Sequence, residues 1–219
     1  MRISVIMASF LGQYPNCASN RTERFRKAVN SFLLNFYKDK ELIIVSDGCP
    51  DTINIVRNEY REPLLAGNII LVEKRKQPLF SGYIRQAGIK KATGKIITYL
   101  DTDDKIGKRH LSNIVQQFIL RPELDWIYYD DYLDVYDSFH TNGQTIPKSV
   151  SLEHGSVGTS SIAHRNIQGL FKKSISWKGC NGYGHDWKFI QRLMKNFPAY
   201  KKVDGGEYYI CHMPNYFGE

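Results

Sequence analysis

The sequence predicts an α/β fold with a mostly parallel central sheet flanked by helices. Short runs rich in β-branched residues, typical of buried strands, alternate with segments whose apolar residues recur at helical spacing. Strands that alternate with helices form parallel βαβ units, and such sheets bind ligands beyond the carboxyl ends of their strands. Polar clusters at 46–48 and 101–104 follow two of the predicted strands, so we expect them to face one pocket.

The first half of the chain carries the regular alternation. Buried strands are predicted at 3–8, 42–45, 69–72 and 96–100. Helices are indicated by periodic apolar residues, by Asp51 and Ser81 as caps, and by Gly94 as a terminator. The first helix carries Phe25, Val29, Phe32, Leu33 and Phe36, the second spans 51–59, the third spans 81–92, and the fourth carries Leu111, Ile114, Val115, Phe118 and Ile119.

The second half is less regular. A stretch rich in tyrosine and aspartate at 128–136 indicates a short pair of strands, and 157–163 indicates another strand. The polar segment 137–155 is a candidate lid, with a functionless insertion as the alternative. No repeat divides the chain, so we expect a single domain over 1–219. A late helix is indicated by Trp187, Ile190, Leu193 and Met194.

Charge and cysteine content narrow the class of protein. Lys and Arg total 30 against 22 Asp and Glu, a net charge of +8. That balance favours an anionic partner: nucleic acid, an anionic membrane surface or a phosphorylated small molecule. The four cysteines form no C-x-x-C pair, which argues against a zinc ribbon and favours reduced thiols in the cytoplasm. We expect neither a membrane span nor a signal peptide, because no apolar run is long enough.

The most informative cluster is DTDD at 101–104. Its three aspartates repel one another and must be neutralised by a cation or by strong hydrogen-bond donors. Mg²⁺ and Mn²⁺ prefer carboxylate oxygen and keep phosphate oxygens or waters as further ligands. The place directly after a buried strand favours an ion that bridges protein and diphosphate over a solvated helix-capping turn. Arg85 could approach the phosphates, whereas the basic stretch 74–76 is expected to be a solvated loop.

Four segments in this order resemble the large second family of inverting glycosyltransferases, which has the GT-A fold and makes polysaccharides and glycolipids. They are SVIMASF at 4–10, ELIIVSDGCPD at 41–51, RQAG with GKII at 85–97, and DTDD at 101–104. Ser46 replaces the first Asp of the family's D-D-G-S, and Cys49 replaces its Ser. The resemblance implies that 1–104 forms the nucleotide-sugar-binding half and 105–219 the half for acceptor and catalytic base.

Carried over by position, the resemblance assigns a donor site. Asp47 would hydrogen-bond uracil or another base. Asp101 would reach the ribose or a metal-bound water, and Asp103 would bind Mn²⁺ or Mg²⁺. The implied nucleotide-sugar-binding residues are Ala8, Ser9, Phe10, Asp47, Arg85, Asp101 and Thr102, where Ala8 and Ser9 replace the Pro and Thr of the family.

The catalytic base of the family lies in an E-D pair that opens a helix after a glycine-rich loop. GYGHDW at 182–187 occupies that place, with His185 in place of Glu and Asp186 as the base. A helix N-terminus keeps a carboxylate ionised, as a base requires, although an Asp there can also simply stabilise the helix. His185 and Trp187 are candidates for the acceptor side. His212 is a candidate metal ligand, with an ordinary tail histidine as the alternative.

We therefore expect an inverting, hexosyl-type transferase that moves a sugar from a nucleotide diphosphate sugar, with UDP-sugar favoured, to a glycan or lipid-linked acceptor of the bacterial cell envelope. One alternative is a nucleotidyltransferase, although 9–13 has too little glycine for its phosphate loop. The other is a non-catalytic domain that binds nucleotide sugar or nucleic acid. Basic residues are scattered rather than striped, so nucleic acid is not expected as a partner. The excess charge suits a cytoplasmic enzyme in peripheral contact with the anionic inner face of the membrane.

Overall fold

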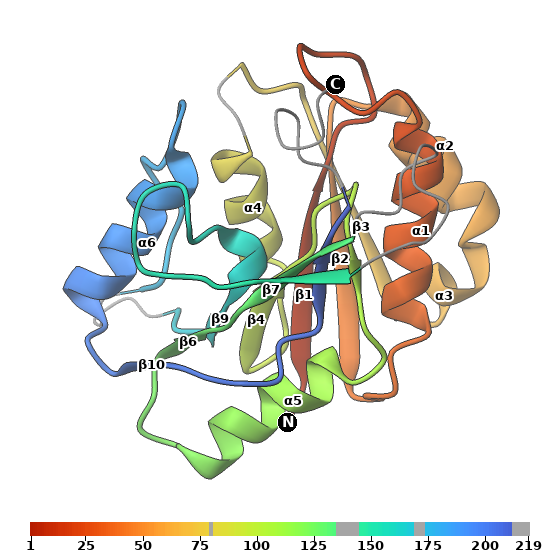
Figure 1. Cartoon of the computed structure of the whole chain (residues 1–219). Coiled ribbons are helices and arrows are strands. Elements are labelled where there is room, and N and C mark those ends of the chain that lie inside the picture. Colours follow the sequence, from red (N-terminus) through yellow and green to blue (C-terminus); the bar gives the residue numbers. More distant parts are fainter. Residues whose placement is uncertain (79–80, 135–144, 169–173, 212–219) are drawn as a thin grey trace.

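Seven strands form a central sheet with helices on both of its faces in the computed structural model (Figure 1). The structure describes residues 1–78, 81–134, 145–168 and 174–211. Neighbours among the first four strands of the chain pair in parallel, whereas the strand at 162–165 is antiparallel to the strands at 96–99 and 126–128. The predicted α/β fold with a mostly parallel sheet is thus confirmed. In sheet order the strands are β10 (Tyr200–Lys202), β6 (Trp126–Tyr128), β9 (Ile162–Arg165), β4 (Ile96–Tyr99), β1 (Ile3–Ser9), β2 (Lys40–Asp47) and β3 (Ile69–Lys74).

Helices lie between the strands as predicted, with some ends shifted. The helix predicted at 51–59 begins at Pro50 after Cys49 rather than after a cap at Asp51, because proline suits the first helical turn. Ser81 precedes the helix predicted at 81–92, but its hydroxyl makes no capping hydrogen bond. Phe36 lies beyond the first helix and is exposed. The helices are α1 (Arg21–Leu33), α2 (Pro50–Glu59), α3 (Arg61–Leu65), α4 (Gly82–Ile89), α5 (His110–Leu120) and α6 (His185–Asn196).

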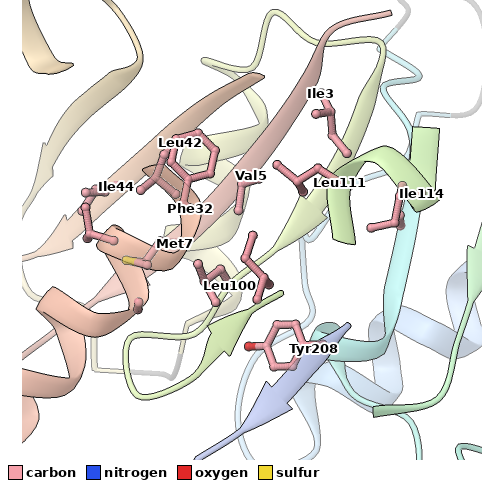
Figure 2. Packing of buried hydrophobic residues seen from close by; sticks show 14 of the residues in the cluster. Ile3, Val5, Met7, Phe32, Leu42, Ile44, Leu100, Leu111, Ile114 and Tyr208 are labelled. Atoms are coloured by element: carbon pink, nitrogen blue, oxygen red, sulfur yellow. The ribbon is translucent and has the colours of Figure 1, made fainter. Parts of the chain in front are cut away.

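The two faces of the sheet carry separate apolar layers, because successive side chains of a strand point to opposite sides. Ile3, Val5 and Met7 of β1 pack in one layer with α1, α2 and α5, whereas Ile6 packs in the other with α4 and α6. Figure 2 shows side chains of α1, β1, β2 and α5 meeting in the first layer. Each fully buried aliphatic side chain stabilises the fold by roughly 1.5–3 kcal/mol. These layers hold the carboxyl ends of β1, β2 and β4 at one edge.

A second sheet has four strands, in the order β5 (Lys105–Ile106), β11 (Tyr208–Ile210), β7 (Asp131–Asp134) and β8 (Thr145–Lys148). The prediction of a strand pair within 128–136 is wrong. β6 pairs with β9 and β10 in the central sheet, and β7 pairs with β8 and β11 instead. Sequence periodicity cannot choose partners for strands this short.

Two further expectations concern the same region. The predicted lid at 137–155 contains β8 in its described part, and 137–144 lies outside the described residues. The strand expected at 157–163 starts later, because a 3-10 turn at Thr159–Ser161 precedes β9.

None of the helices that the structure describes is long and apolar enough to span a bilayer. Strands from 1–104 and from 105–219 share the central sheet, so both halves contribute to its edge.

Candidate active site

Asp47 is the last residue of β2, at the carboxyl edge of the sheet. The Lys76 Nζ lies 2.6 Å from its Oδ2, and the backbone N–H of Gln77 donates to its Oδ1 at 2.7 Å. Gly48 permits this approach, since its φ is +62° and a Cβ there would meet the Lys76 backbone nitrogen at 2.5 Å. The stretch 74–76 is therefore not simply a solvated loop. Lys76 belongs to the site.

The end of β1 lies beside this edge. Ser9 is 1% exposed, and its Oγ shares a 2.7 Å hydrogen bond with Thr52 Oγ1 of α2. Ala8 and Phe10 are half-buried, and Lys76 Nζ lies 4.3 Å from the centre of the Phe10 ring. Of the three predicted residues of this segment, Ala8 and Phe10 thus present side-chain surface, whereas the Ser9 hydroxyl is committed to α2.

The acidic turn follows β4 at the same edge. Asp104 is buried: the Tyr208 hydroxyl donates to its Oδ2 and the Cys211 backbone N–H to its Oδ1, both at 2.9 Å. Burial, together with the charges of Asp103 and Asp101, holds the pKa of Asp104 well above its usual range. Asp101 is 36% exposed and Asp103 is half-buried. The turn therefore contains one structural carboxylate and two that are more exposed.

The more exposed pair suits a divalent ion that brings oxygen ligands of its own. Within the described ranges there is no group of three or more His, Cys, Asp or Glu side chains that could hold a metal ion. Mg²⁺ characteristically uses one or two carboxylates and completes its shell with phosphate oxygens and waters. Asp103 and Asp101 fit that pattern. The predicted ligand His212 lies outside the described residues.

Arg85 of α4 connects the acidic turn to α6. It is 4% exposed, its Nη2 donates to Asp101 Oδ1 at 2.8 Å, and its Nη1 donates to Asp186 Oδ1 at 2.7 Å. Its guanidinium carbon lies 5.1 Å from the centre of the Trp177 ring. Burial lowers the pKa of Arg85, but Asp186 and Asp101 raise it by more, so the group stays charged. One cation thus holds a carboxylate from each half of the chain.

Asp186 lies in the first turn of α6, where the helix dipole favours an ionised carboxylate. Gly184 precedes the helix with a φ of +72°, which turns the chain into it. The Asp186 side chain is 34% exposed. Its Oδ1 lies near Arg85 Nη1 and, at 3.1 Å, near His185 Nε2. Its Oδ2 has no hydrogen-bond partner in the part of the chain that the structure describes.

The remaining predicted residues lie close by. The His185 side chain is 14% exposed, and its Nε2 lies 3.0 Å from Ser81 Oγ. Trp187 is half-buried against the second apolar layer, with its ring centre 6.2 Å from that of His154. Thr102 is 8% exposed. The structure therefore groups Asp101, His185 and Asp186 around Arg85, while Asp47 and the end of β1 make a separate set of contacts.

The Trp177 ring beside Arg85 is itself held by a chain of buried hydrogen bonds. Trp177 Nε1 donates to the Tyr99 hydroxyl at 3.0 Å, and that hydroxyl lies 2.7 Å from His164 Nε2. Burial lowers the pKa of His164 to about 4, so its imidazole stays neutral and can accept. Sequence reasoning missed Ser81 and Lys76 as site residues. No local signal marks them, because their partners are 104 and 29 residues away.

The chain is similar to glycosyltransferases along almost its whole length. It is 26% identical over 228 residues to an uncharacterized glycosyltransferase of Nostoc sp. (strain PCC 7120), covering 94% of this chain and 66% of the relative. It is 25% identical to TarP of Staphylococcus aureus (strain N315), a poly(ribitol-phosphate) β-N-acetylglucosaminyltransferase, covering 95% of this chain and 62% of the relative. The chain thus spans slightly less than two thirds of the length of these relatives.

Solved structures show the same fold. S. aureus TarS in complex with UDP-GlcNAc superposes with a TM-score of 0.67 at 18% identity, over 97% of this chain and 59% of that one. A mannosyltransferase of Pyrobaculum calidifontis in complex with GDP-Man and Mn²⁺ gives 0.62 at 11% identity, over 96% and 56%. The sequence profile of Glycosyl transferase family 2 matches residues 17–169, well over half of the chain. The chain therefore belongs to glycosyltransferase family 2 and has the GT-A fold that its motifs predict.

Proposed function

We propose that this glycosyltransferase moves a sugar from a UDP-sugar to a hydroxyl of a glycan or lipid-linked acceptor, with inversion and with Asp186 as the base. The observation that carries the proposal is the joining of Asp101 and Asp186 by Arg85. It brings the turn expected to bind the donor next to a carboxylate with an uncommitted oxygen. The UDP-GlcNAc complex of TarS and the activity named for TarP support a UDP-sugar donor.

The donor nucleotide would lie along the carboxyl edge of the sheet. The Asp47 carboxylate, oriented by Lys76 and the Gln77 N–H, would receive the base. Ala8 and Phe10 would line the base pocket with their side chains. Ser9 would act through its main chain, because its hydroxyl bonds Thr52. Asp101 and Thr102 would meet the ribose, and Arg85 would contact the nucleotide through Asp101.

The reaction would be a single displacement at the anomeric carbon. Asp186 Oδ2 takes the proton from the acceptor hydroxyl while that oxygen forms its bond to the anomeric carbon. The bond from this carbon to the diphosphate breaks on the opposite side, and its electron pair leaves with the diphosphate. A positioned base of this kind typically raises the reaction rate by roughly 10²–10⁴-fold. Attack from the side opposite the leaving group inverts the configuration.

Asp103 would hold a divalent ion, Mn²⁺ or Mg²⁺, jointly with the donor diphosphate, and Asp101 would reach the ribose or a water bound to that ion. When bound, such an ion neutralises the charge that develops on the departing phosphate. The complex of the P. calidifontis mannosyltransferase with GDP-Man and Mn²⁺ supports this choice of cofactor. Asp104 would not join the ion, since Tyr208 and Cys211 already bond its two oxygens. His212 remains a candidate ligand.

Acceptor and location follow from the charge balance. The net charge is +8, yet the site is acidic, so the excess cations lie on the rest of the surface. Such a surface suits an anionic glycan acceptor, and TarP is a poly(ribitol-phosphate) β-N-acetylglucosaminyltransferase. It equally suits peripheral contact with an anionic membrane from the cytoplasm. His185 and Trp187 would flank the acceptor. The division of labour between 1–104 and 105–219 within one domain is part of this proposal.

A thermal-shift panel of nucleoside diphosphates and their sugars, each with and without Mn²⁺, tests the proposed function. A ligand at 100 times its dissociation constant stabilises the folded state by about 2.7 kcal/mol, so binding should raise the melting temperature measurably. We expect the largest shifts for UDP and a UDP-sugar, and larger ones with Mn²⁺. No metal-dependent shift with any member would overturn the proposal. Release of pyrophosphate from a nucleoside triphosphate would favour a nucleotidyltransferase instead.

A further inference from the structure

The two oxygens of Asp186 have different surroundings. Oδ1 lies 2.7 Å from Arg85 Nη1 and 3.1 Å from His185 Nε2. Oδ2 has no hydrogen-bond partner among the described residues, and the side chain is 34% exposed. A carboxylate held by one oxygen keeps a fixed orientation and leaves the other oxygen to accept a proton. The groups that hold Oδ1 therefore decide which oxygen is available.

Arg85 supplies that hold, because a His185 nitrogen that offers a lone pair cannot donate to Oδ1. A guanidinium has five N–H donors in a rigid plane and no acceptor. Nη1 can direct one N–H to Asp186 Oδ1 and its other N–H to His185 Nε2, which lies 3.1 Å away. Nη2 directs one N–H to Asp101 Oδ1 at 2.8 Å. The plane cannot turn without breaking several bonds, and the Trp177 ring lies 5.1 Å from its carbon.

His185 matches this donor geometry only as a neutral imidazole. Arg85 cannot accept a hydrogen bond, so the Nε2 that faces its Nη1 must offer a lone pair, with the ring proton on Nδ1. Among the described residues, Ser81 Oγ, Arg85 Nη1 and Asp186 Oδ1 lie within 3.1 Å of this nitrogen, with Asp101 on the other side of the guanidinium. Burial lowers the pKa of His185, Asp186 raises it and Arg85 lowers it, and the net direction is down.

We propose that His185 is a positioning residue for Asp186: as an uncharged acceptor it fixes the Arg85 guanidinium, which holds Oδ1 and leaves Oδ2 as the proton-accepting oxygen. The inference rests on the proposed function, in which Asp186 is the base. A carboxylate in place of His185 would also accept from Arg85, but it would add a third negative charge to one guanidinium. That charge would repel the Asp186 carboxylate and compete with it for the Arg85 guanidinium. The neutral acceptor avoids this cost.

Three substitutions of His185 separate the loss of its hydrogen-bond acceptor from a change in its charge. His185→Leu removes the acceptor, and we expect kcat to fall roughly 10- to 100-fold, the cost of a misplaced catalytic group. His185→Gln supplies an uncharged amide oxygen and should recover most of that loss. His185→Glu supplies an acceptor with a charge and should recover less of the kcat loss than His185→Gln, because the added charge repels the Asp186 carboxylate. The donor KM should change less than kcat in all three, because the Arg85 guanidinium keeps its hydrogen bond to Asp101 on the nucleotide side.

His110→Gln is the matched control. His110 is 0% exposed, and its hydrogen-bond partners are Glu207 and Tyr129. Its ring also packs on Tyr208, but it makes no contact with Arg85 or Asp186 that the structure describes. The substitution should leave kcat and its pH profile as in the unchanged protein, and thermal unfolding of each variant confirms that it folds. Unchanged kcat in His185→Leu, or a loss in His185→Gln as large as in His185→Leu, would overturn the inference. If Asp186→Asn itself retains turnover, the failure lies in the proposed base and not in the role of His185.

Discussion

Two buried carboxylates at opposite ends of the central sheet have pKa values shifted in opposite directions. Glu41, at the start of β2, is 1% exposed, and it accepts hydrogen bonds from Ser4, Thr93 and Gly94 and pairs with Arg2. Burial raises its pKa, but the hydrogen bonds from Ser4 and Thr93 outweigh burial, so the net shift is downward. At this end of the sheet, hydrogen bonds and Arg2 thus compensate the negative charge of the Glu41 carboxylate.

Asp104, beyond the end of β4, shows the reverse. It is 7% exposed and has hydrogen bonds from Tyr208 and Cys211, yet burial raises its pKa, and the negative charges of Asp103 and Asp101 raise it further. The amino edge of the sheet is thus arranged for stability, whereas the carboxyl edge keeps an excess of negative charge. Such an excess is costly in the protein alone and favours a bound cation. Substitutions at the two edges should therefore separate activity from stability.

Asp186→Asn should have the largest effect. The amide cannot take the acceptor proton, so we expect the rate of sugar transfer to fall by roughly 10²–10⁴-fold. The side chain is 34% exposed, so the free energy of unfolding should change little. Initial rates of transfer and thermal unfolding with and without UDP and Mn²⁺ check both points. Retained turnover would remove Asp186 from the mechanism.

Arg85→Met should lower activity and stability together, because Arg85 joins the carboxyl edge to α6. Breaking a fully buried ion pair costs about 3–5 kcal/mol, but Asp101 and Asp186 are 36% and 34% exposed and regain water. We therefore expect a loss of about 1–3 kcal/mol in denaturant unfolding, with turnover close to background. Unaltered stability would show that the Arg85 ion pairs contribute nothing to the fold. Arg85, at the carboxyl edge, would then contribute to activity alone.

Glu41→Gln should cost stability and leave activity intact. Loss of hydrogen bonds to a buried charge should lower the free energy of unfolding by about 1–3 kcal/mol at neutral pH. Because the folded pKa of Glu41 is depressed, its contribution is present above the ordinary value of 4.5 and is lost as the pH falls through the lower folded value. Unfolding curves of both proteins should therefore converge below that pH. The control Glu23→Gln removes an exposed pair with Lys27 and should change nothing measurable. Reduced turnover in folded Glu41→Gln would contradict the division.

Gly48→Ala should have the smallest effect on kcat, because it acts on the donor side of the site. A left-handed φ costs a non-glycine residue about 1–2 kcal/mol, and the new Cβ would push Lys76 away from Asp47. We expect the donor KM to rise several-fold. Gly67→Ala is the matched control, because its φ is +73° and a Cβ there meets nothing within 4 Å. Equal donor KM values for the two variants would show that Lys76 does not orient Asp47 for the nucleotide.

Local patterns predicted the elements of the first half well. The strand at 3–8 and the strand at 42–45 lie within β1 and β2, and the apolar spacing around Phe25 and Phe32 predicted α1. In the first half the errors were at helix ends and in the missed short helix α3, and the one wrong pairing was that of the strands at 128–136. A strand of three or four residues has too few alternating positions to reveal its partner, so pairing is decided by the surrounding sheet.

Sequence alone determined that this chain is an α/β protein with acidic and polar groups at one sheet edge, and the resemblance of its motifs to a family added Asp47, Arg85, Asp101 and Asp186 as candidates. Periodicity and turn residues are short-range properties, so they can be recognised in the chain itself. Only the tertiary structure decided that Arg85 reaches Asp186, 101 residues away, and that Ser81 meets His185. Such contacts depend on how α4 and α6 pack on the same face of the sheet, and no local pattern encodes that packing.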